Sequence, residues 1–329
     1  MEHIGQAAAR AVMNADRASR GEILRPATRE EWLALRKRDV TASQAAALLG
    51  QHPYSSAYQL WADKTGRASE DSDENGAMKR GRLLEPVVIE MLREERPDWI
   101  IEYPLGLTYY RDPALRIGAT PDAFATIPSQ GGRGIVQAKT TSDYSFRANW
   151  IDPDTNEVVL PIWIAVQAIV EADLAGADWA VVAVLTVGHG IDLHVIDIPL
   201  HEGVRKRLYA AVADFWRIVE RGDHPPIDWL KDGRAVLDVY RDSDGSEADL
   251  SAVEGFDQMV ADYHAAKADE RAAKERAEMI RPQIVATLGN AEIGETLRWR
   301  VTAKTQYRKA YEVKASSSRV LRVKQKVES

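Results

Sequence analysis

The sequence is organised around residues 118–141, GATPDAFATIPSQGGRGIVQAKTT. This stretch predicts two short strands around a glycine-rich turn, with Asp122 at the end of the first strand. Gln137 and Lys139 lie on the second strand. Successive side chains of a strand point to opposite faces, so Gln137 and Lys139 share one face and Ala138 lies on the other. The hairpin therefore gathers an acid, an amide and a lysine.

A Pro-Asp, a glycine turn and then an acid or amide two residues before a lysine is typical of metal-dependent phosphodiesterase sites. The acid and its neighbour hold a hard cation through oxygen, and the lysine meets the attacked phosphate or the attacking water. A purely structural interpretation stands beside this one. Pro-Asp and Gly-Gly-Arg-Gly are common in turns, and a lysine that ends a strand usually faces solvent. The rest of the chain has to decide between them.

The composition indicates a soluble globular protein, with 329 residues of which 45% are hydrophobic and 28% charged. The sequence has no cysteine, which excludes disulfides, zinc–thiolate sites and iron–sulfur clusters. Residues 1–21 lack the apolar core of a signal peptide. No stretch approaches the ~18 apolar residues of a membrane span. We expect a cytoplasmic protein without membrane association.

The net charge of −7 is unevenly distributed. Residues 298–329 hold ten Lys and Arg against two Asp and Glu, whereas the remainder holds 33 against 48. Such asymmetry indicates a basic segment suited to a polyanion such as DNA. A solvated tail is the equally weighted alternative.

Apolar periodicity predicts an α/β fold with a mixed β-sheet flanked by helices. We expect three domains: a lead-in over residues 1–27, a main domain over 28–230, and a C-terminal arm over 231–329. The expected elements before the hairpin are a helix that follows the capping box at Thr28, a helix over 77–95 and a strand region over 99–110. Those after it are helices over 161–174 and 201–221, strands over 179–187 and 191–198, a long helix over 249–288, and a small basic β segment.

Further candidate residues lie on the predicted helices. Glu85 falls beside the apolar stripe of the helix over 77–95, where a carboxylate is costly unless it is paired or binds a metal. Thr41 or Ser43 is expected to cap a short helix that ends at Gly50, and Arg36 precedes it. A helix N-terminus with hydroxyls and arginines can bind phosphate, although a plain capped core helix is the commoner case.

Six motifs in order resemble the YqaJ-type viral recombinases, relatives of lambda exonuclease within the PD-(D/E)xK nuclease superfamily. The resemblance covers roughly residues 28–220. The motifs are LRKRDVTAS, ALLGQHPYSS, AMKRGRLLEP, IGATPDAF, GIVQAKT and the helix that carries Gln167. Each motif alone is weak, but all six in this order and spacing are specific.

The resemblance implies a restriction-endonuclease-like core and a Mg²⁺-dependent exonuclease, with Mn²⁺ able to substitute. Such an enzyme degrades one strand of linear double-stranded DNA from its 5′ end. It leaves a 3′ overhang for a phage single-strand annealing protein. Relatives form toroidal homotrimers threaded by DNA, so the resemblance also implies a homo-oligomer.

The resemblance also implies roles for individual residues. Asp122 matches the metal aspartate, Glu85 the helix glutamate near the metals, and Lys139 the catalytic lysine. Gln167, which lies one helical turn before Glu171, matches a glutamine that supports the lysine side of the site.

Arg36 and Ser43 match the pair that grips the 5′ phosphate. One position departs from the family pattern. Gln137 stands where the family normally has glutamate, as the third expected metal ligand, and an amide oxygen ligates a cation without bringing charge.

Gln137 leaves a rival from another class open, namely a non-catalytic DNA-end-binding protein with a degenerate nuclease site. A restriction-type endonuclease, which would also cleave closed circles, is a second alternative. A Cas4-like nuclease shares the core but needs an iron–sulfur cluster, which the absence of cysteine excludes.

Overall fold

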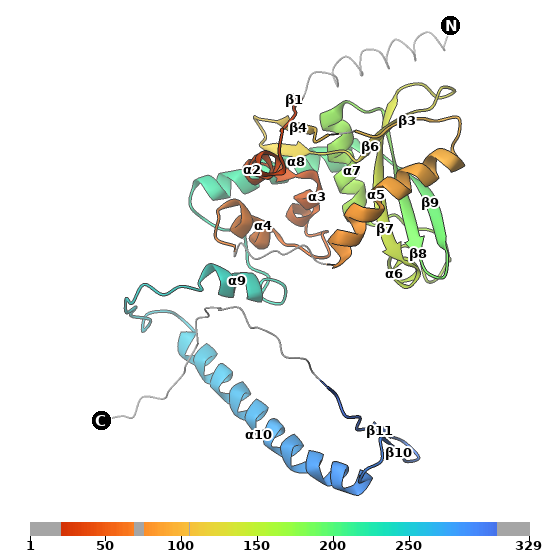
Figure 1. The fold of residues 1–329 in the computed structure, drawn as a ribbon. Helices are drawn as coiled ribbons and strands as arrows, with labels where there is room; N and C mark the ends of the chain where they lie inside the picture. Colours follow the sequence, from red (N-terminus) through yellow and green to blue (C-terminus); the bar gives the residue numbers. More distant parts are fainter. Residues whose placement is uncertain (1–20, 69–75, 105, 308–329) are drawn as a thin grey trace. The chain divides into compact units, whose positions relative to one another are not determined.

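The computed structural model describes residues 21–68, 76–104 and 106–307, and the chain divides into two compact units, residues 1–239 and 240–329 (Figure 1). All candidate site residues belong to the first unit. Residues 231–239, which the sequence assigned to the C-terminal arm, also belong to it: Ser56 donates a hydrogen bond to buried Asp232. Most of the expected lead-in and the end of the basic tail lie outside the described residues.

A five-stranded mixed sheet forms the centre of the first unit and confirms the predicted α/β fold. Its strands, in spatial order, are β3 (Ile100–Glu102), β6 (Ala123–Thr126), β7 (Arg133–Ser142), β8 (Trp179–Val187) and β9 (Ile191–Ile198). β7 and β8 are parallel, and the other neighbouring pairs are antiparallel. The predicted hairpin is β6–β7, and Gly131 and Gly132 in its turn have φ of 70° and 75°, which glycine adopts without strain.

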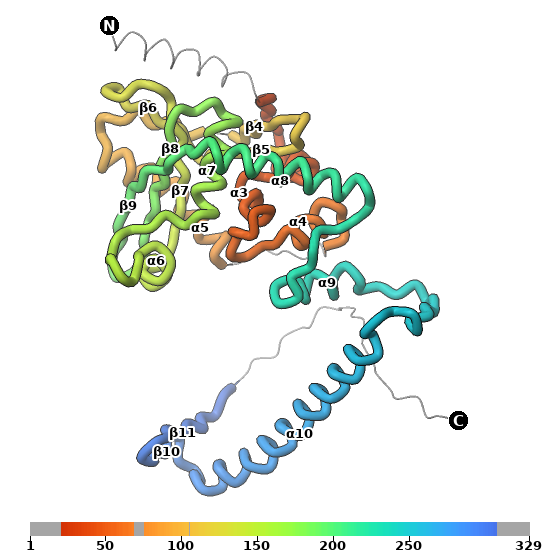
Figure 2. The backbone as a smooth tube through the Cα atoms, turned by 180° about the vertical axis from the view of Figure 1, so that it is seen from behind, coloured from red at the N-terminus to blue at the C-terminus, as the bar shows by residue number. Residues whose placement is uncertain are grey.

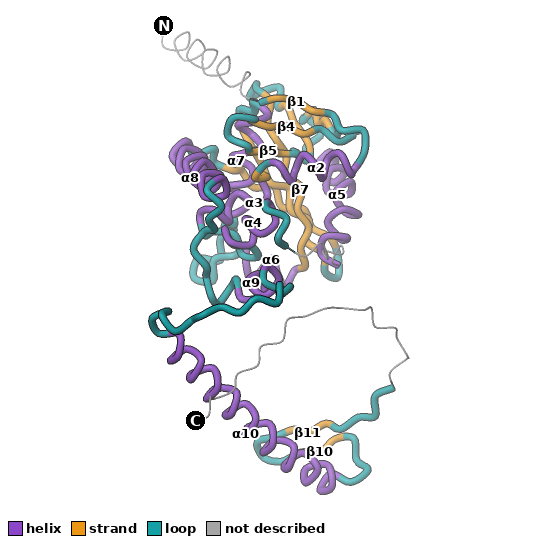
Figure 3. The backbone as a smooth tube through the Cα atoms, turned by 90° about the vertical axis from the view of Figure 1, so that its left-hand side faces the viewer, coloured by secondary structure: helices purple, strands orange, loops and turns teal. Residues whose placement is uncertain are grey.

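Alternate residues of the sheet bury opposite faces. Ile135 of β7 and Val182 of β8 pack in the core that contains α7 (Ile162–Ala175), and Gln137 and Lys139 share that face. Val136 and Val181 pack against α5 (Gly76–Glu95) on the other face. Figure 3 shows α5 and α7 on the two sides of the strands. The predicted sharing of one face by Gln137 and Lys139 is therefore confirmed.

A second, four-stranded sheet lies beside the first. Its order is β1 (Glu22–Leu24), β4 (Tyr109–Asp112), β5 (Ile117–Ala119) and β2 (Val40–Thr41). The single strand region predicted over residues 99–110 is wrong, because β3 and β4 belong to different sheets. Pro104 has no backbone N–H to donate to a ladder and lies between them. The first strand of the predicted 118–141 stretch likewise divides into β5 and β6, and Asp122 lies between them.

The remaining helices of the first unit surround these sheets. They are α2 (Arg29–Arg38), α3 (Ala42–Ala45), the 3₁₀ helix η1 (Ala46–Leu49), α4 (Ala57–Lys64), α6 (Asp143–Asn149), α8 (Glu202–Glu220) and α9 (Gly233–Val239). Figure 2 shows α8 crossing α3 and α4, and it packs on η1. No element is expected from the sequence between residues 221 and 249, so α9 is a correction.

Two predicted helix caps need correction. The Thr28 hydroxyl accepts the Glu31 backbone N–H at 3.2 Å, but the Glu31 carboxylate accepts the N–H of Ala27 and not that of Thr28. Thr41 occupies the N-cap position of α3 without a side-chain cap bond, and Ser43 lies inside that helix. Gly50 ends η1 in the left-handed conformation, with φ of 68°, as predicted.

The second unit contains α10 (Phe256–Leu288) and the antiparallel strands β10 (Ile293–Glu295) and β11 (Arg300–Thr302). The helix was predicted from residue 249 and begins after Gly255, whose φ is 74°. Gly289 follows its last residue, as predicted. None of the helices in the described part of the chain combines the length and hydropathy that a membrane crossing needs.

Gly118 of β5 positions the segment that leads to Asp122. A Cβ at this residue would overlap the ring and hydroxyl of Tyr109, and that hydroxyl donates to Asp39 at 3.1 Å. Asp39 is fully buried and pairs with Arg111 at 2.8 Å. Tyr109 thus has little room to move without breaking a buried polar network.

We expect Gly118→Ala to lower the free energy of unfolding by about 1–3 kcal/mol, because an overfilled core must shift its neighbours. Urea unfolding followed by circular dichroism measures the change. Gly81→Ala is the control: Gly81 lies in α5 with open space around it, and alanine there should stabilise by up to about 1 kcal/mol. Equal effects of the two substitutions would contradict the packing argument.

Candidate active site

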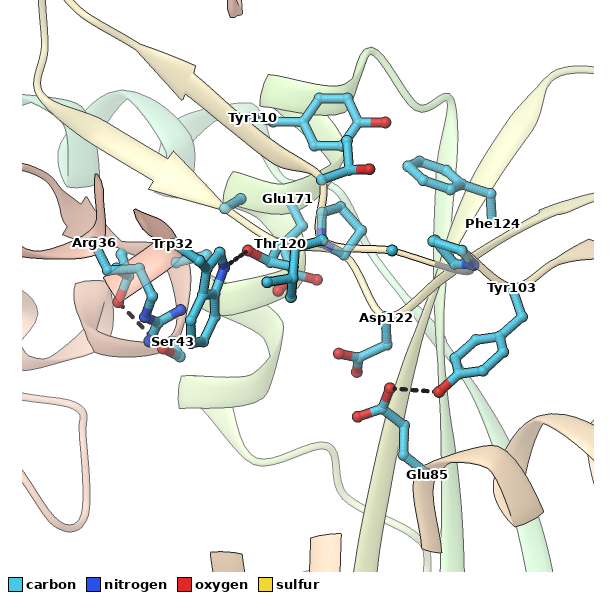
Figure 4. A pocket seen from close by; sticks show the side chains of 18 of the residues that line it. Trp32, Arg36, Ser43, Glu85, Tyr103, Tyr110, Thr120, Asp122, Phe124 and Glu171 are labelled. Atoms are coloured by element: carbon cyan, nitrogen blue, oxygen red, sulfur yellow. Dashed lines mark hydrogen bonds between the residues drawn. The ribbon is translucent and has the colours of Figure 1, made fainter. Parts of the chain in front are cut away.

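A cleft of about 900 Å³ opens between α2, α5, α7 and the segment that joins β5 to β6. A second cavity of about 760 Å³ extends toward α6 and the start of α7. The two cavities share four lining residues: Arg36, Arg82, Glu85 and Asp122. The two hollows therefore meet at the acids that the sequence singled out, and Figure 4 shows this region.

Asp122 lies directly before β6 and opposite Gln137 of β7. Its Oδ2 accepts two hydrogen bonds, from Nε2 of Gln137 at 2.6 Å and from the backbone N–H of Ala138 at 2.9 Å. The amide group that Gln137 turns to Asp122 is thus its nitrogen, and not the oxygen that the sequence assigned to a cation. These two donors hold the carboxylate rigidly at the entrance of the hairpin.

Glu85 projects from α5 toward Asp122, and Figure 4 shows the two carboxylates facing each other. The hydroxyl of Tyr103 donates to Oε1 of Glu85 at 3.1 Å. Partial burial, followed by the nearby negative charge of Asp122, raises the pKa of Glu85 to about 6. A partly buried carboxyl whose pKa is raised beside a second carboxylate in a cleft is typical of a functional site.

A chain of polar groups lines the α7 side of the site. Nζ of Lys139 donates to Oε1 of Gln167 at 3.3 Å, and Nε2 of Gln167 donates to Oε1 of Glu171 at 2.8 Å. Glu171 is only 1% exposed. Burial first, and then the negative charge of Asp122, raise its pKa to about 8. Lys139 also lies over the ring of Trp163, with Nζ 6.0 Å from the ring centroid.

Two buried oxygens at this site have no hydrogen-bond partner among the described residues: Oε1 of Gln137 and Oε2 of Glu171. Buried polar atoms are nearly always partnered, so each such atom needs an explanation. No three His, Cys, Asp or Glu side chains of the described ranges converge into a metal-binding group by themselves. Asp122 and Glu85, whose carboxylates face each other, are the acids placed to hold a cation, and the other two oxygens belong to side chains next to them in the site.

Arg36 and Ser43 lie at the other side of the cleft. The guanidinium of Arg36 stacks over Trp32, 4.4 Å from the ring centroid, and Nε1 of Trp32 donates to Oγ1 of Thr120 at 3.0 Å. Burial lowers the pKa of Arg36, the charges of Asp63 and Glu171 act against this, and its guanidinium forms no salt bridge among the described residues. The Ser43 hydroxyl lies 3.2 Å from that of Thr41.

The fold thus brings the predicted residues together around one connected space. Arg36, Ser43, Glu85, Asp122 and Gln167 line the first cavity and Lys139 the second, with Gln137 buried behind Asp122.

Sequence reasoning missed several residues of the same cleft. Tyr103, which holds Glu85, carries no local signal, because its partner lies on a helix 18 positions earlier. Arg25 and Arg29 also line the cleft. The density of arginines just before and within α2 was the signal that could have found them.

Comparison with known proteins agrees with the resemblance that the motifs predict. The family model described as the YqaJ-like viral recombinase domain matches residues 31–169. The uncharacterized protein YqaJ of Bacillus subtilis (strain 168) is 29% identical over 133 residues, which are 40% of this chain and 39% of that protein. The chain therefore matches about two fifths of the length of this relative. The family match confirms the resemblance.

Solved structures with a similar course of the chain include two exonucleases. An alkaline exonuclease (LHK-Exo) from Laribacter hongkongensis is 21% identical, with a TM-score of 0.44 over 63% of this chain and 99% of that chain. A putative exonuclease from Eubacterium rectale is 11% identical, with a TM-score of 0.41 over 70% of this chain and 99% of that chain.

The buried carboxyl of Glu171 makes stability depend on pH in a defined direction. Its pKa is about 8 in the folded protein against an ordinary value of 4.5. Between these values the unfolded chain has lost a proton that the folded chain keeps. The free energy of unfolding therefore falls as pH rises through this window, by at most about 1.4 kcal/mol per pH unit.

Glu171→Gln removes this proton and keeps the shape of the side chain. In metal-free buffer with EDTA, we expect the variant to gain stability relative to the natural protein from about pH 5 upward, levelling off above about pH 8. Urea unfolding at a series of pH values measures the difference. Parallel pH profiles for the two proteins would show that Glu171 titrates normally in the folded state.

Proposed function

From the match of residues 31–169 to the model of the YqaJ-like viral recombinase domain, we propose that the protein is a metal-dependent 5′-to-3′ exonuclease on linear double-stranded DNA. It leaves 3′ single-stranded overhangs for recombination by strand annealing. The family match supports a DNA nuclease. The observation that carries the proposal is the meeting of Asp122, Glu85 and the Lys139–Gln167 pair around one connected cleft of this domain.

The donor set fits Mg²⁺, with Mn²⁺ able to substitute. Mg²⁺ prefers carboxylate and carbonyl oxygens and keeps several waters, so one or two protein carboxylates suffice. Asp122 and Glu85 supply these, and Gln137 and Glu171 each have a buried oxygen without a hydrogen-bond partner among the described residues. When bound, the ion would polarise the phosphoryl oxygens and lower the pKa of a bound water.

The chain's own residues have defined tasks in this proposal. The Ala138 N–H and the Gln137 amide fix Asp122, and the Tyr103 hydroxyl orients Glu85. Lys139, which Gln167 holds through Nζ, would orient the attacking water and offset negative charge at the phosphate.

For Gln137 to act as a ligand, its amide must turn so that Oε1 replaces Nε2 beside Asp122. A cation favours this turn, because it repels the N–H group and attracts the oxygen.

Arg36 and Ser43 would hold the 5′ phosphate of the strand that is trimmed. A guanidinium without a carboxylate partner keeps its donors for a ligand, and bidentate bonds to phosphate are strong and directional. Trp32 stacks on Arg36 and is itself fixed by Thr120, so the guanidinium is held before the ligand arrives. Such preorganisation would set the end of the duplex relative to Asp122.

Partners follow from the same proposal. The substrate is the end of a DNA duplex, and the product overhang would pass to a single-strand annealing protein of phage recombination. A homo-oligomer, by resemblance a trimer, would enclose the duplex and keep the enzyme on it. The basic residues 298–307 of the second unit would add phosphate contacts.

One observation favours a second candidate, a non-catalytic DNA-end-binding protein. Gln137 donates to Asp122 and so satisfies, without a cation, the carboxylate oxygen that a metal would otherwise use. Cleavage assays with Mg²⁺ and Mn²⁺ separate the two candidates. A restriction-type endonuclease would in addition cut closed circular duplex.

Asp122→Asn and Glu85→Gln should each lower nuclease activity roughly hundredfold or more, since each removes charge that the proposed reaction needs. The assay follows release of nucleotides from linear duplex labelled at the 5′ or the 3′ end, beside nicked and closed circles. End binding in Ca²⁺ should persist. Glu90→Gln is the matched control on α5, because Glu90 is exposed and bonds Arg93 outside the cleft. Full activity of Asp122→Asn would remove this residue from the site.

Arg36→Ala should selectively impair the use of duplex ends that carry a 5′ phosphate. The measured quantity is the ratio of cleavage rates for 5′-phosphorylated and 5′-hydroxyl ends, which should fall toward one. Lys37→Ala is the control, because Lys37 is exposed on the same helix and does not line the cleft. An unchanged ratio in Arg36→Ala would place the phosphate site elsewhere.

A further inference from the structure

We propose that Glu171 supplies the carboxylate that Gln137 lacks, so that the third acidic group of the cation site comes from α7 and not from β7. The inference rests on the proposed function, because it concerns the same cation. It adds a ligand that the hairpin motif does not contain. The argument has three steps, which concern charge, placement and the missing partner of Oε2.

The first step is charge. Gln137 is neutral, and its N–H points at Asp122 over 2.6 Å. With Gln137 in this place, Asp122 and Glu85 are the acids that the hairpin and α5 deliver. The affinity of a site for a hard cation depends on the number of charged ligands. A third carboxylate must therefore come from elsewhere if the site is to match one built with glutamate on β7.

The second step is placement. Glu171 lines the same cleft as Asp122 and Glu85, and its charge is coupled to that of Asp122. Figure 4 shows Asp122 between Glu85 and Glu171. Gln167 donates to Oε1 of Glu171 and accepts from Lys139, so one helical turn links this carboxylate to the lysine. Helix α7 can then hold Lys139 through Gln167 and the cation through Glu171.

The third step is the missing partner. Oε2 of Glu171 is buried and has no hydrogen-bond partner among the described residues. If Oε2 carries a proton, that proton lacks an acceptor. If the carboxyl is ionised, the nearby charges of Lys139 and Arg36 favour it, but no salt bridge of the described residues includes Glu171. Neither protonation state satisfies the atom, whereas a cation beside Asp122 does so.

A structural role alone does not account for this residue. The bond from Gln167 to Oε1 would also form with the amide oxygen of a glutamine at position 171, at no cost in buried charge. The carboxylate is useful only to a group that needs its second oxygen or its charge. Lys139 and Arg36 act on Glu171 through their charge, but Lys139 donates its hydrogen bond to Gln167, so Oε2 of Glu171 is left without a partner among the described residues.

The test compares four proteins: the natural chain, Glu171→Gln, Gln137→Glu and the double exchange Gln137→Glu/Glu171→Gln. Mn²⁺ binding in the absence of DNA is measured by electron paramagnetic resonance of the free ion and by calorimetry. We expect Glu171→Gln to bind roughly 10- to 100-fold more weakly. The double exchange should return to within a few-fold of the natural chain, and Gln137→Glu should bind more tightly.

Glu90→Gln is the control for loss of an acid on a neighbouring helix, and it should bind like the natural chain. Circular dichroism and urea unfolding in EDTA check that each variant is folded.

Equal Mn²⁺ affinity of Glu171→Gln and the natural chain would overturn the inference and leave the nuclease proposal intact, provided that the natural chain binds Mn²⁺ and cleaves DNA. A double exchange that stays as weak as Glu171→Gln would overturn it too, because positions 137 and 171 would then not be interchangeable. A natural chain that neither binds Mn²⁺ nor cleaves DNA would instead refute the proposed function.

Discussion

The parallel pairing of β7 with β8 is the constraint on which the rest of the site depends. The two strands run side by side from the pair Gly134–Trp179 to the pair Ser142–Val187. Parallel neighbours cannot be joined by a tight turn, so the chain must cross over one face of the sheet. Here the crossover contains α6 and α7. It places α7 on the face that carries Gln137 and Lys139, which is why Lys139 meets Gln167.

The site also works against electrostatic repulsion. Burial raises the pKa of Glu85 and of Glu171, and the negative charge of Asp122 raises both further. Without a cation, the negative charges of these carboxylates repel one another. The fold holds the carboxylates in place through hydrogen bonds from Tyr103, Gln167 and the Ala138 N–H. The stability of the surrounding sheets and helices therefore keeps an unfavourable cluster in place, as functional sites commonly require.

The amide of Gln137 reduces the repulsion between acidic groups in the hairpin. A glutamate at this position would face Asp122 across the β6–β7 pair, and two carboxylates there would repel each other. The amide instead donates to Asp122, so the hairpin is stable before any ligand binds. An amide at position 137 thus relieves repulsion inside the hairpin, and the buried carboxyl of Glu171 on α7 lines the same cleft.

Local pattern was enough to determine much of this protein. Glycine and proline chemistry placed the β6–β7 turn and the ends of η1, α7 and α10, because backbone conformations that only glycine adopts freely depend on neighbours in sequence. Continuous and alternating apolar runs gave β8 and β9 with the observed bounds, and ordered motifs pointed to the family whose model matches residues 31–169.

Only the tertiary structure decided the rest, because it depends on contacts between distant parts of the chain. The residues near Pro104 split into strands of two different sheets, and no local rule assigns a strand to a sheet. Tyr103 reaches Glu85, and Trp32 reaches Thr120, 88 positions away. The direction of Glu171 followed from the crossover that the parallel pair imposes. The sequence places Glu171 on its helix, but its raised pKa results from burial and from the charge of Asp122, which depend on the tertiary structure.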